Sequence, residues 1–122
     1  MDISALDDGY TAEVPFGEDA VVTMRYLTLE ESREISRKSR KRIWKDHQMA
    51  EEFDSTKSAI MLGRAVVKGW SGITKDGAEY PYTPENCDFL MTHYNEFFRL
   101  VNETCGNMQA FVKKQQDETI KN

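Results

Sequence analysis

The sequence predicts an α+β protein in which an N-terminal β-hairpin precedes a mainly helical domain of about four helices. Three observations support this fold class. Residues 10–27 alternate between apolar and polar side chains, Thr28 begins a helix-capping pattern, and residues 59–70 carry an apolar stripe with helical spacing. We expect a single domain over residues 10–112, preceded by a flexible N-terminus at 1–9 and followed by a polar tail at 113–122.

The hairpin is expected over residues 10–27. The stretches YTAEVPF and AVVTMRYLT both alternate, and a short turn that contains Gly17 separates them. Two alternating runs joined by such a turn are typical of antiparallel strands. Pro15 suits an edge strand, because proline cannot donate a hydrogen bond to a neighbouring strand.

A first helix is expected over about residues 29–49. Thr28 and Glu31 have the spacing of a capping box, in which the hydroxyl accepts from the amide three residues on and the carboxylate reaches back. The helix would be strongly charged and would bury little apolar surface. Its few apolar side chains are Leu29, Ile35, Ile43 and Trp44.

Three further helices complete the expected domain. Residues 56–69 form the best core helix, because apolar residues recur from Ala59 to Trp70 at helical spacing before Gly69 and Gly72 end it. Thr83 and Pro84 begin a short helix at 84–93, since a hydroxyl cap and a proline at the first position favour a helix start. A last helix follows at 95–112.

Composition excludes several classes of protein. The chain has 122 residues, 30% of them charged, and a formal net charge of −5, which argues against a surface built for nucleic acid. Its apolar stretches are shorter than the ~20 residues that a membrane helix needs. The N-terminus lacks the features of a secretory signal, and two cysteines fit free thiols. We therefore expect a cytoplasmic protein.

The residues offer no pattern for catalysis or for a cofactor. Cys87 and His93 are six positions apart, which would turn them about 120° from each other on a helix, so they cannot share a metal. A phosphate-binding loop precedes a helix, whereas the glycines around Trp70 follow one. We expect no enzyme, no cofactor and no metal site. An enzyme using Cys87 or Cys105 would need an unusually reactive thiol.

Two groups of residues are candidates for interaction. A basic run on the expected first helix includes Arg37, Arg40, Lys41 and Trp44, and it could contact protein or phosphate. Protein contacts or a solvated face are favoured over nucleic acid. An aromatic corner would pack Trp70 against the loop that follows it, although a ligand or partner role is also open. The corner residues are Trp70, Gly72, Tyr80, Pro81 and Tyr82.

The same corner resembles the tail assembly chaperones of long-tailed bacteriophages and prophages. In that family a helix ends in V-x-x-W-x-G-I/V and is followed by an acidic Gly turn, an aromatic-Pro-aromatic stretch and S/T-x-E-N. Here the matching stretches are VVKGWSGI, the turn Asp76-Gly77, and YPYTPEN. The stretch RYLTLEE is similar to the family's Arg-aromatic pair before an acidic helix start. The resemblance covers most of residues 10–105. This chain departs from the pattern at Lys68-Gly69, where an acidic residue is common.

The resemblance implies a non-enzymatic protein that binds the tape-measure protein, helps to deliver tail-tube protein, and acts as a homo-oligomer. Such a protein needs adaptable apolar contacts rimmed by charge, and Phe and Met side chains suit that use. Besides the basic run, candidate partner-binding residues are Phe97, Phe98 and Phe111. The alternative function is a nucleic-acid-binding accessory protein that uses the basic helix around residues 37–45.

Overall fold

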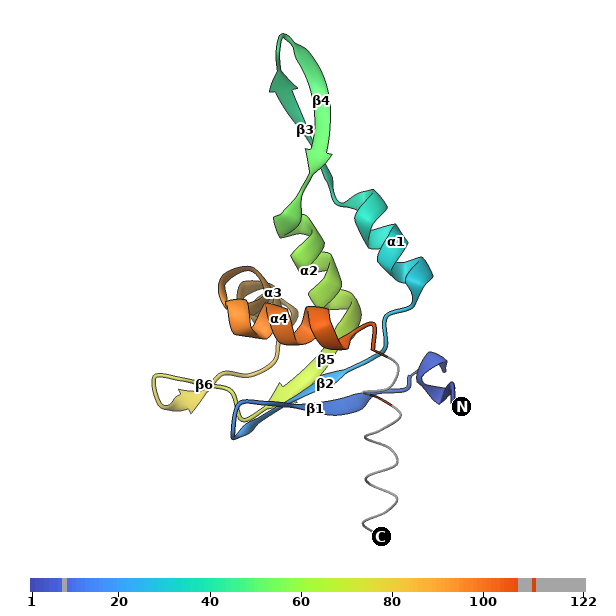
Figure 1. The fold of residues 1–122 in the computed structure, drawn as a ribbon. Coiled ribbons are helices and arrows are strands. Elements are labelled where there is room, and N and C mark those ends of the chain that lie inside the picture. The colour runs from blue at the N-terminus through green and yellow to red at the C-terminus, as the bar shows by residue number, and fades with distance from the viewer. Residues whose placement is uncertain (8, 108–110, 112–122) are drawn as a thin grey trace.

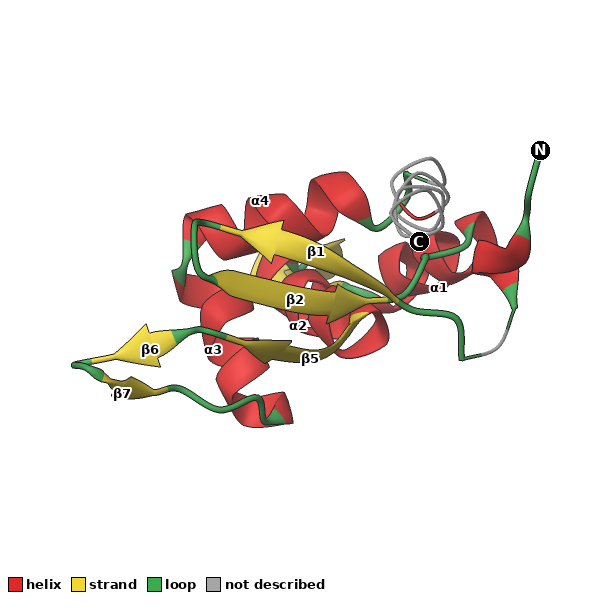
Figure 2. Cartoon of the chain, turned by 90° about the horizontal axis from the view of Figure 1, so that it is seen from below, coloured by secondary structure: helices red, strands yellow, loops and turns green. Residues whose placement is uncertain are grey.

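The structure is a computed structural model that describes residues 1–7, 9–107 and 111. It has an α+β fold of two layers, in which helices cover one face of a three-stranded antiparallel sheet. Figure 2 shows the sheet in front of the helices, and Figure 1 shows a separate two-stranded ribbon that extends beyond them. The predicted fold class is confirmed.

The sheet has the strand order β1-β2-β5. The predicted hairpin is present as β1 (Ala12–Phe16) and β2 (Ala20–Met24), and β5 (Val67–Ser71) pairs with the other edge of β2. Val14 lies opposite Val22, so these apolar side chains share the face that the helices cover. Val22 and Met24 are fully buried there.

The helices are α1 (Leu29–Lys38), α2 (Ser55–Val66), α3 (Pro84–His93) and α4 (Asn95–Thr104). A one-turn 3-10 helix, η1 (Ser4–Leu6), precedes the sheet and buries Ala5, in the segment that the sequence led us to expect to be flexible. A small hairpin of β6 (Thr74–Lys75) and β7 (Ala78–Glu79) leads from the sheet towards α3.

The start of α1 is tied to the end of β2. Thr28 and Glu31 form both hydrogen bonds of the predicted capping box. The Glu31 carboxylate also accepts from the Arg25 guanidinium, and one of these bonds is 3.0 Å long. That guanidinium is the main reason why the pKa of Glu31 falls to about 2, so the carboxylate stays ionised and keeps both its cap and its ion pair.

The predicted helix over residues 29–49 is wrong in its second half. Helix α1 ends at Lys38, and residues 40–53 form an antiparallel ribbon of β3 (Arg40–Lys45) and β4 (Gln48–Phe53). The charged residues here are good helix formers, but the apolar side chains are too sparse to bury a long helix against the body. In the ribbon, the backbone N–H and C=O groups of β3 form hydrogen bonds with those of β4, so they are satisfied without a helix.

The ends of two other predicted helices also differ. Helix α2 stops at Val66, and the chain continues as β5, because the open edge of β2 supplies hydrogen-bond partners for Val67–Ser71. Helix α4 stops at Thr104, where the amide of Leu27 donates to the carbonyl of Cys105 at 2.8 Å. Residues 108–110 and 112 of the predicted last helix, and the predicted tail at 113–122, lie outside the described residues.

Trp70 therefore lies on a strand and not at the end of a helix. It faces Val22 across the sheet, which directs the indole towards the helical layer. The indole N–H donates to the carbonyl of Tyr80 at 2.7 Å. Its ring packs edge-on against Tyr82 and Phe97, with centroids 5.1 Å and 5.6 Å away, and is parallel to the ring of Tyr80. The ring thus joins β5, the loop before α3, and α4.

The rest of the corner is held by backbone contacts. Pro81 contributes its carbonyl, which accepts from the Asn86 side chain at 2.9 Å in the first turn of α3. Gly72 has a φ of 80° and follows β5 directly. A Cβ there would lie 2.2 Å from the carbonyl oxygen of Asp19 in the β1–β2 turn. Only glycine allows this close approach without strain.

We expect Gly72→Ala to lower the free energy of unfolding by at least about 2 kcal/mol, because it adds both a left-handed strain and a backbone clash. Gly69→Ala is the matched control, since a Cβ at Gly69 would have no atom within 4 Å. Urea titration of both variants measures the difference. Equal losses would contradict the role of the contact between Gly72 and the β1–β2 turn.

The two tryptophans should differ sharply in their effect on stability. Trp70→Ala removes a half-buried ring together with its hydrogen bond, and should cost about 3 kcal/mol. Trp44→Ala removes a ring that is 67% exposed on the ribbon, and should cost less than about 1 kcal/mol. Denaturant melts of the two variants compare them directly, and a small loss for Trp70→Ala would contradict its role as an anchor.

Candidate functional site

The most distinctive surface of the molecule is the β3–β4 ribbon, residues 40–53, which we call the arm. Figure 1 shows it projecting past the ends of α1 and α2, away from the sheet. Its strands pair in register from Arg40 opposite Phe53 to Lys45 opposite Gln48. An isolated two-stranded ribbon is marginally stable in water, so an arm of this kind gains from a partner.

A two-residue turn closes the tip of the arm. Asp46 and His47 both have positive φ, at 53° and 64°. Two successive residues in this conformation match the type I′ turn, whose twist fits the twist of paired strands. Asp and His adopt it more readily than most residues other than glycine.

The base of the arm is fixed to the body. Ser39 is fully buried between α1 and β3, and its hydroxyl donates to the carbonyl of Ile35 at 2.5 Å. The amide of Asp54 donates to the carbonyl of Ser39 at 2.9 Å, and the Asp54 carboxylate caps α2 by accepting from the amide of Lys57. Hydrogen bonds therefore fix the base of the arm to the helices, whereas its tip projects away from the body.

One face of the arm carries its three most exposed large apolar side chains. Residues directly opposite each other in an antiparallel pair share a face, and this rule places Trp44 with Met49. Alternation along β4 puts Phe53 on the same face. These three side chains are 67%, 57% and 51% exposed. The face therefore offers a row of solvent-exposed apolar groups, in which the Arg42–Glu51 pair separates Phe53 from Trp44 and Met49. This row is the candidate interaction surface of the arm.

Charges lie within and beside this apolar row. Arg40 and Arg42 lie on the same face, with Glu51 opposite Arg42. On the other face Lys41 forms an ion pair with Glu52 at 3.3 Å. Within the part of the chain that the structure describes, no ion pair engages Arg40, Arg42 or Lys45. The arm thus carries free positive charge beside its apolar row.

The candidate partner-binding residues fall into two groups. Arg40, Lys41 and Trp44 lie on the arm, while Arg37 lies on α1 and is paired with Glu34 at 2.5 Å. Phe97 and Phe111 are fully buried and Phe98 is half-buried against the core, so the first two cannot serve as an exposed contact surface. The helical stripe of α4 faces inward, because it supplies the core beneath the sheet.

Sequence reasoning missed Met49 and Phe53. The signal that could have found them is the β-favouring pair Ile43-Trp44 followed by Asp46-His47, residue types that tolerate a tight turn. The absence of an Asn-Gly or Asp-Gly pair made this hairpin easy to read as helix.

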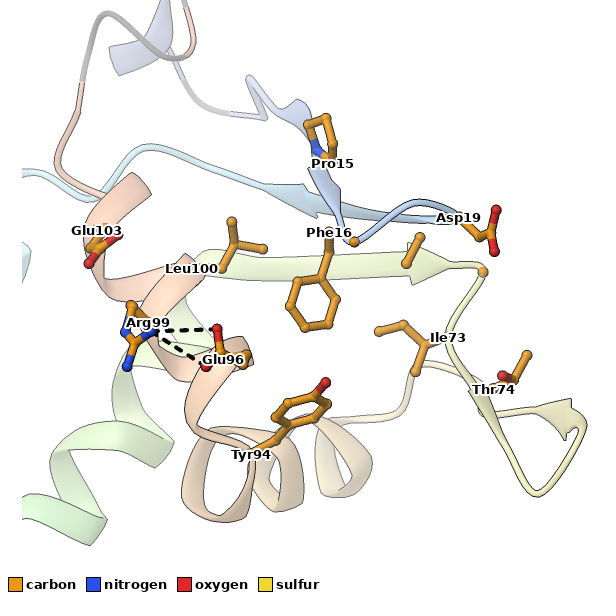
Figure 3. Close-up of a pocket in the computed structure, with 13 residues that line it drawn as sticks. Pro15, Phe16, Asp19, Ile73, Thr74, Tyr94, Glu96, Arg99, Leu100 and Glu103 are labelled. Atoms are coloured by element: carbon orange, nitrogen blue, oxygen red, sulfur yellow. Dashed lines mark hydrogen bonds and ion pairs between the residues drawn. The ribbon is translucent and has the colours of Figure 1, made fainter.

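A second surface lies at the other end of the molecule. A groove of about 620 Å³ opens between the β1–β2 turn, the segment after β5, and α4 (Figure 3). Phe16, Ile73, Tyr94 and Leu100 form its apolar part, and Figure 3 shows the side chain of Phe16 between those of Leu100, Tyr94 and Ile73. Phe16 and Tyr94 pack edge-on, with ring centroids 5.8 Å apart.

Acidic side chains predominate at the rim of this groove. Asp19, Glu96 and Glu103 line it together with a single basic residue, Arg99, which is 3.4 Å from Glu96. Among the described residues, neither Asp19 nor Glu103 has an ion-pair partner. The groove therefore combines an apolar floor with uncompensated negative charge.

The cysteines lie in apolar surroundings. Cys87 is buried on α3, and burial raises the pKa of its thiol to about 12. Burial also raises the pKa of Cys105. A thiol with a raised pKa is a poor nucleophile, because the thiolate is the reactive form. Over the described ranges, no group of three His, Cys, Asp or Glu side chains is placed to hold a metal ion, and no helix is long and apolar enough to span a membrane.

Comparison with known proteins identifies the class. The chain matches the family model described as YdaY prophage protein over residues 24–122, and it belongs to that family. It is therefore a prophage protein. The matched region contains the whole arm. No curated protein and no solved structure shows a significant match to the chain.

We expect both thiols of the native protein to react with iodoacetamide at pH 8 at least about 10-fold more slowly than a free cysteine, because each is buried with a raised pKa. Both should react at the ordinary rate in urea. Mass spectrometry of time points gives the two rates. A thiol that reacts fast in the native state would instead support the hypothesis of an enzyme that uses Cys87 or Cys105.

Proposed function

We propose that this prophage protein is a non-enzymatic tail assembly chaperone, which binds the tape-measure protein and helps tail-tube assembly in the host cytoplasm. The observation that carries the proposal is the apolar row of the arm, formed by Trp44, Met49 and Phe53. The resemblance of the corner around Trp70 to the tail chaperones, and the prophage family, agree with it.

The chemistry of the arm suits a helical apolar client. A tape-measure protein of the kind that the resemblance implies has long apolar helices, which need cover before the tail forms. Met49 is flexible and polarisable, so it can adapt to different apolar surfaces, and Trp44 supplies a large contact area. Arg40 and Arg42 beside the row keep the free arm soluble and can pair with acidic residues on the polar side of a client helix.

Nucleic acid is the alternative client, and the arm fits it less well. A two-stranded ribbon can enter the major groove of DNA. However, the basic strand β3 faces Glu51 and Glu52 on β4, and Glu52 already neutralises Lys41. These carboxylates oppose binding to a phosphate backbone. The basic run is divided between the end of α1, which carries Arg37, and this ribbon, so it does not form the continuous helix on which the alternative first rested.

The proposal predicts that the double variant Trp44→Ser/Met49→Ser binds the tape-measure protein of the same prophage much more weakly than the wild-type chain does. Removing two neighbouring anchors should weaken binding at least ~10-fold. Light scattering of the co-expressed proteins measures the complex. Phe89→Ser is the matched control, since it removes an aromatic ring that is 49% exposed on α3, far from the arm in the sequence.

An unchanged complex in the double variant would contradict the arm as the client site, and no complex with the wild-type chain would contradict the chaperone function itself. Salt-dependent binding to DNA that disappears in Arg40→Glu/Arg42→Glu would favour the alternative.

A further inference from the structure

We propose that the arm of one copy docks into the groove of a second copy, so that the protein assembles head to tail through two different surfaces. The inference uses the arm that the proposed function also uses, but it rests on the groove, which the proposed function does not need. It assigns a partner, a second copy of this chain, to the groove of about 620 Å³ beside α4.

The two surfaces are complementary in chemistry. The tip of the arm presents the Trp44–Met49 pair, and the groove presents an apolar floor. Arg42 shares the face of Trp44, with Glu51 opposite it, and Lys45 lies on the other face of the arm. Asp19 and Glu103 line the groove. Within the described residues Arg42, Lys45, Asp19 and Glu103 form no ion pair in their own chain. Docking would pair charges that are free in the monomer.

The position of the two surfaces makes the contact intermolecular. The tip of the arm and the β1–β2 turn, which forms one wall of the groove, lie at opposite ends of the molecule (Figure 1). An arm held at its base by Ser39 cannot reach its own groove. A contact between two different surfaces of identical chains is heterologous, and it repeats until it closes a ring or extends a filament.

The dimensions permit this contact and predict that it is weak. Strands of six residues extend about 20 Å, which is long enough to reach into a neighbour. The groove has the size of common side-chain and ligand pockets. A single arm tip buries less than the ~1,000 Å² of a stable interface, so assembly should depend on protein concentration. Its charge pairs are exposed at the rim, so salt should weaken it.

Self-docking also has a consequence for the client. When the arm is in a neighbour's groove, its apolar row is covered. A client that binds the same row must displace the groove, so client and self-assembly compete for the arm. The assembly thus keeps the apolar row covered until a client displaces the groove.

The experiment reverses the charge of each surface in the full chain. Arg42→Glu makes the arm more acidic, and Glu103→Arg makes the groove more basic. Sedimentation velocity from about 1 to 200 µM measures assembly. Each single variant should raise the dissociation constant at least ~10-fold, because like charges then meet. A 1:1 mixture of the two, and the double variant alone, should recover assembly, since opposite charges again face each other. Glu13→Arg on β1 is the control for the change of net charge in Glu103→Arg.

A wild-type chain that stays monomeric over this range would overturn the proposal. Loss of assembly in Arg42→Glu but not in Glu103→Arg would also overturn it, because the arm would then pair with something other than the groove. The groove variant separates this inference from the proposed function: Glu103→Arg should still bind the tape-measure protein. Self-assembly without tape-measure binding would contradict only the proposed function.

Discussion

The packing of Trp70 is the interaction on which the rest of the structure depends. One indole ring contacts a strand neighbour, a loop and a helix, and its N–H satisfies the carbonyl of Tyr80 at 2.7 Å. A half-buried tryptophan can do this because it combines a large apolar surface with one donor. The sheet edge, the start of α3 and the position of α4 are all fixed by contacts that converge at this ring.

The groove follows from the same corner. The chain turns at Gly72 immediately after β5, and the β1–β2 turn rests on this glycine at a distance that excludes a side chain. Ile73 then lies beside Phe16 and Tyr94 (Figure 3). The apolar floor of the groove is thus the edge of the hydrophobic core beside Trp70, where the sheet and the helices pack together. Its acidic character comes from Asp19 in the β1–β2 turn and from Glu96 and Glu103 on α4.

The residues that stabilise the fold and the residues of the candidate interaction surface lie in different parts of the molecule. The body contains the buried cluster between the sheet and the helices, while the arm lies outside that cluster and exposes its largest apolar side chains. A surface of this kind can bind and release partners without disturbing the core, since little of the folding free energy resides in it. This division agrees with the proposed chaperone function and with the proposed docking of the arm in a second copy.

The sequence by itself determined the α+β class, the first hairpin, the capped start of α1 and the start of α3. These depend on local rules: alternation, the capping box at Thr28 and Glu31, and Pro84 at the first helical position. It also identified the residues of the aromatic corner, because Trp70 and its neighbours are unusual in composition. Local rules did not decide between helix and ribbon for residues 40–53, where good helix formers and β-favouring residues stand side by side.

Only the tertiary structure decided the arm, the strand at Val67–Ser71 and the groove. Val67–Ser71 continues an apolar helical stripe, yet the open edge of β2 offered hydrogen bonds that a longer helix could not use. Phe97 and Phe111 were indistinguishable from contact residues until the sheet and α4 buried them. Asp19 and Glu103 are 84 positions apart in the chain, and they line one groove, at its two ends, only because the β1–β2 turn folds against α4 (Figure 3). Whether a residue lies in the core, in the groove or on the arm depends on contacts between distant parts of the chain, and the local sequence pattern does not reveal these contacts.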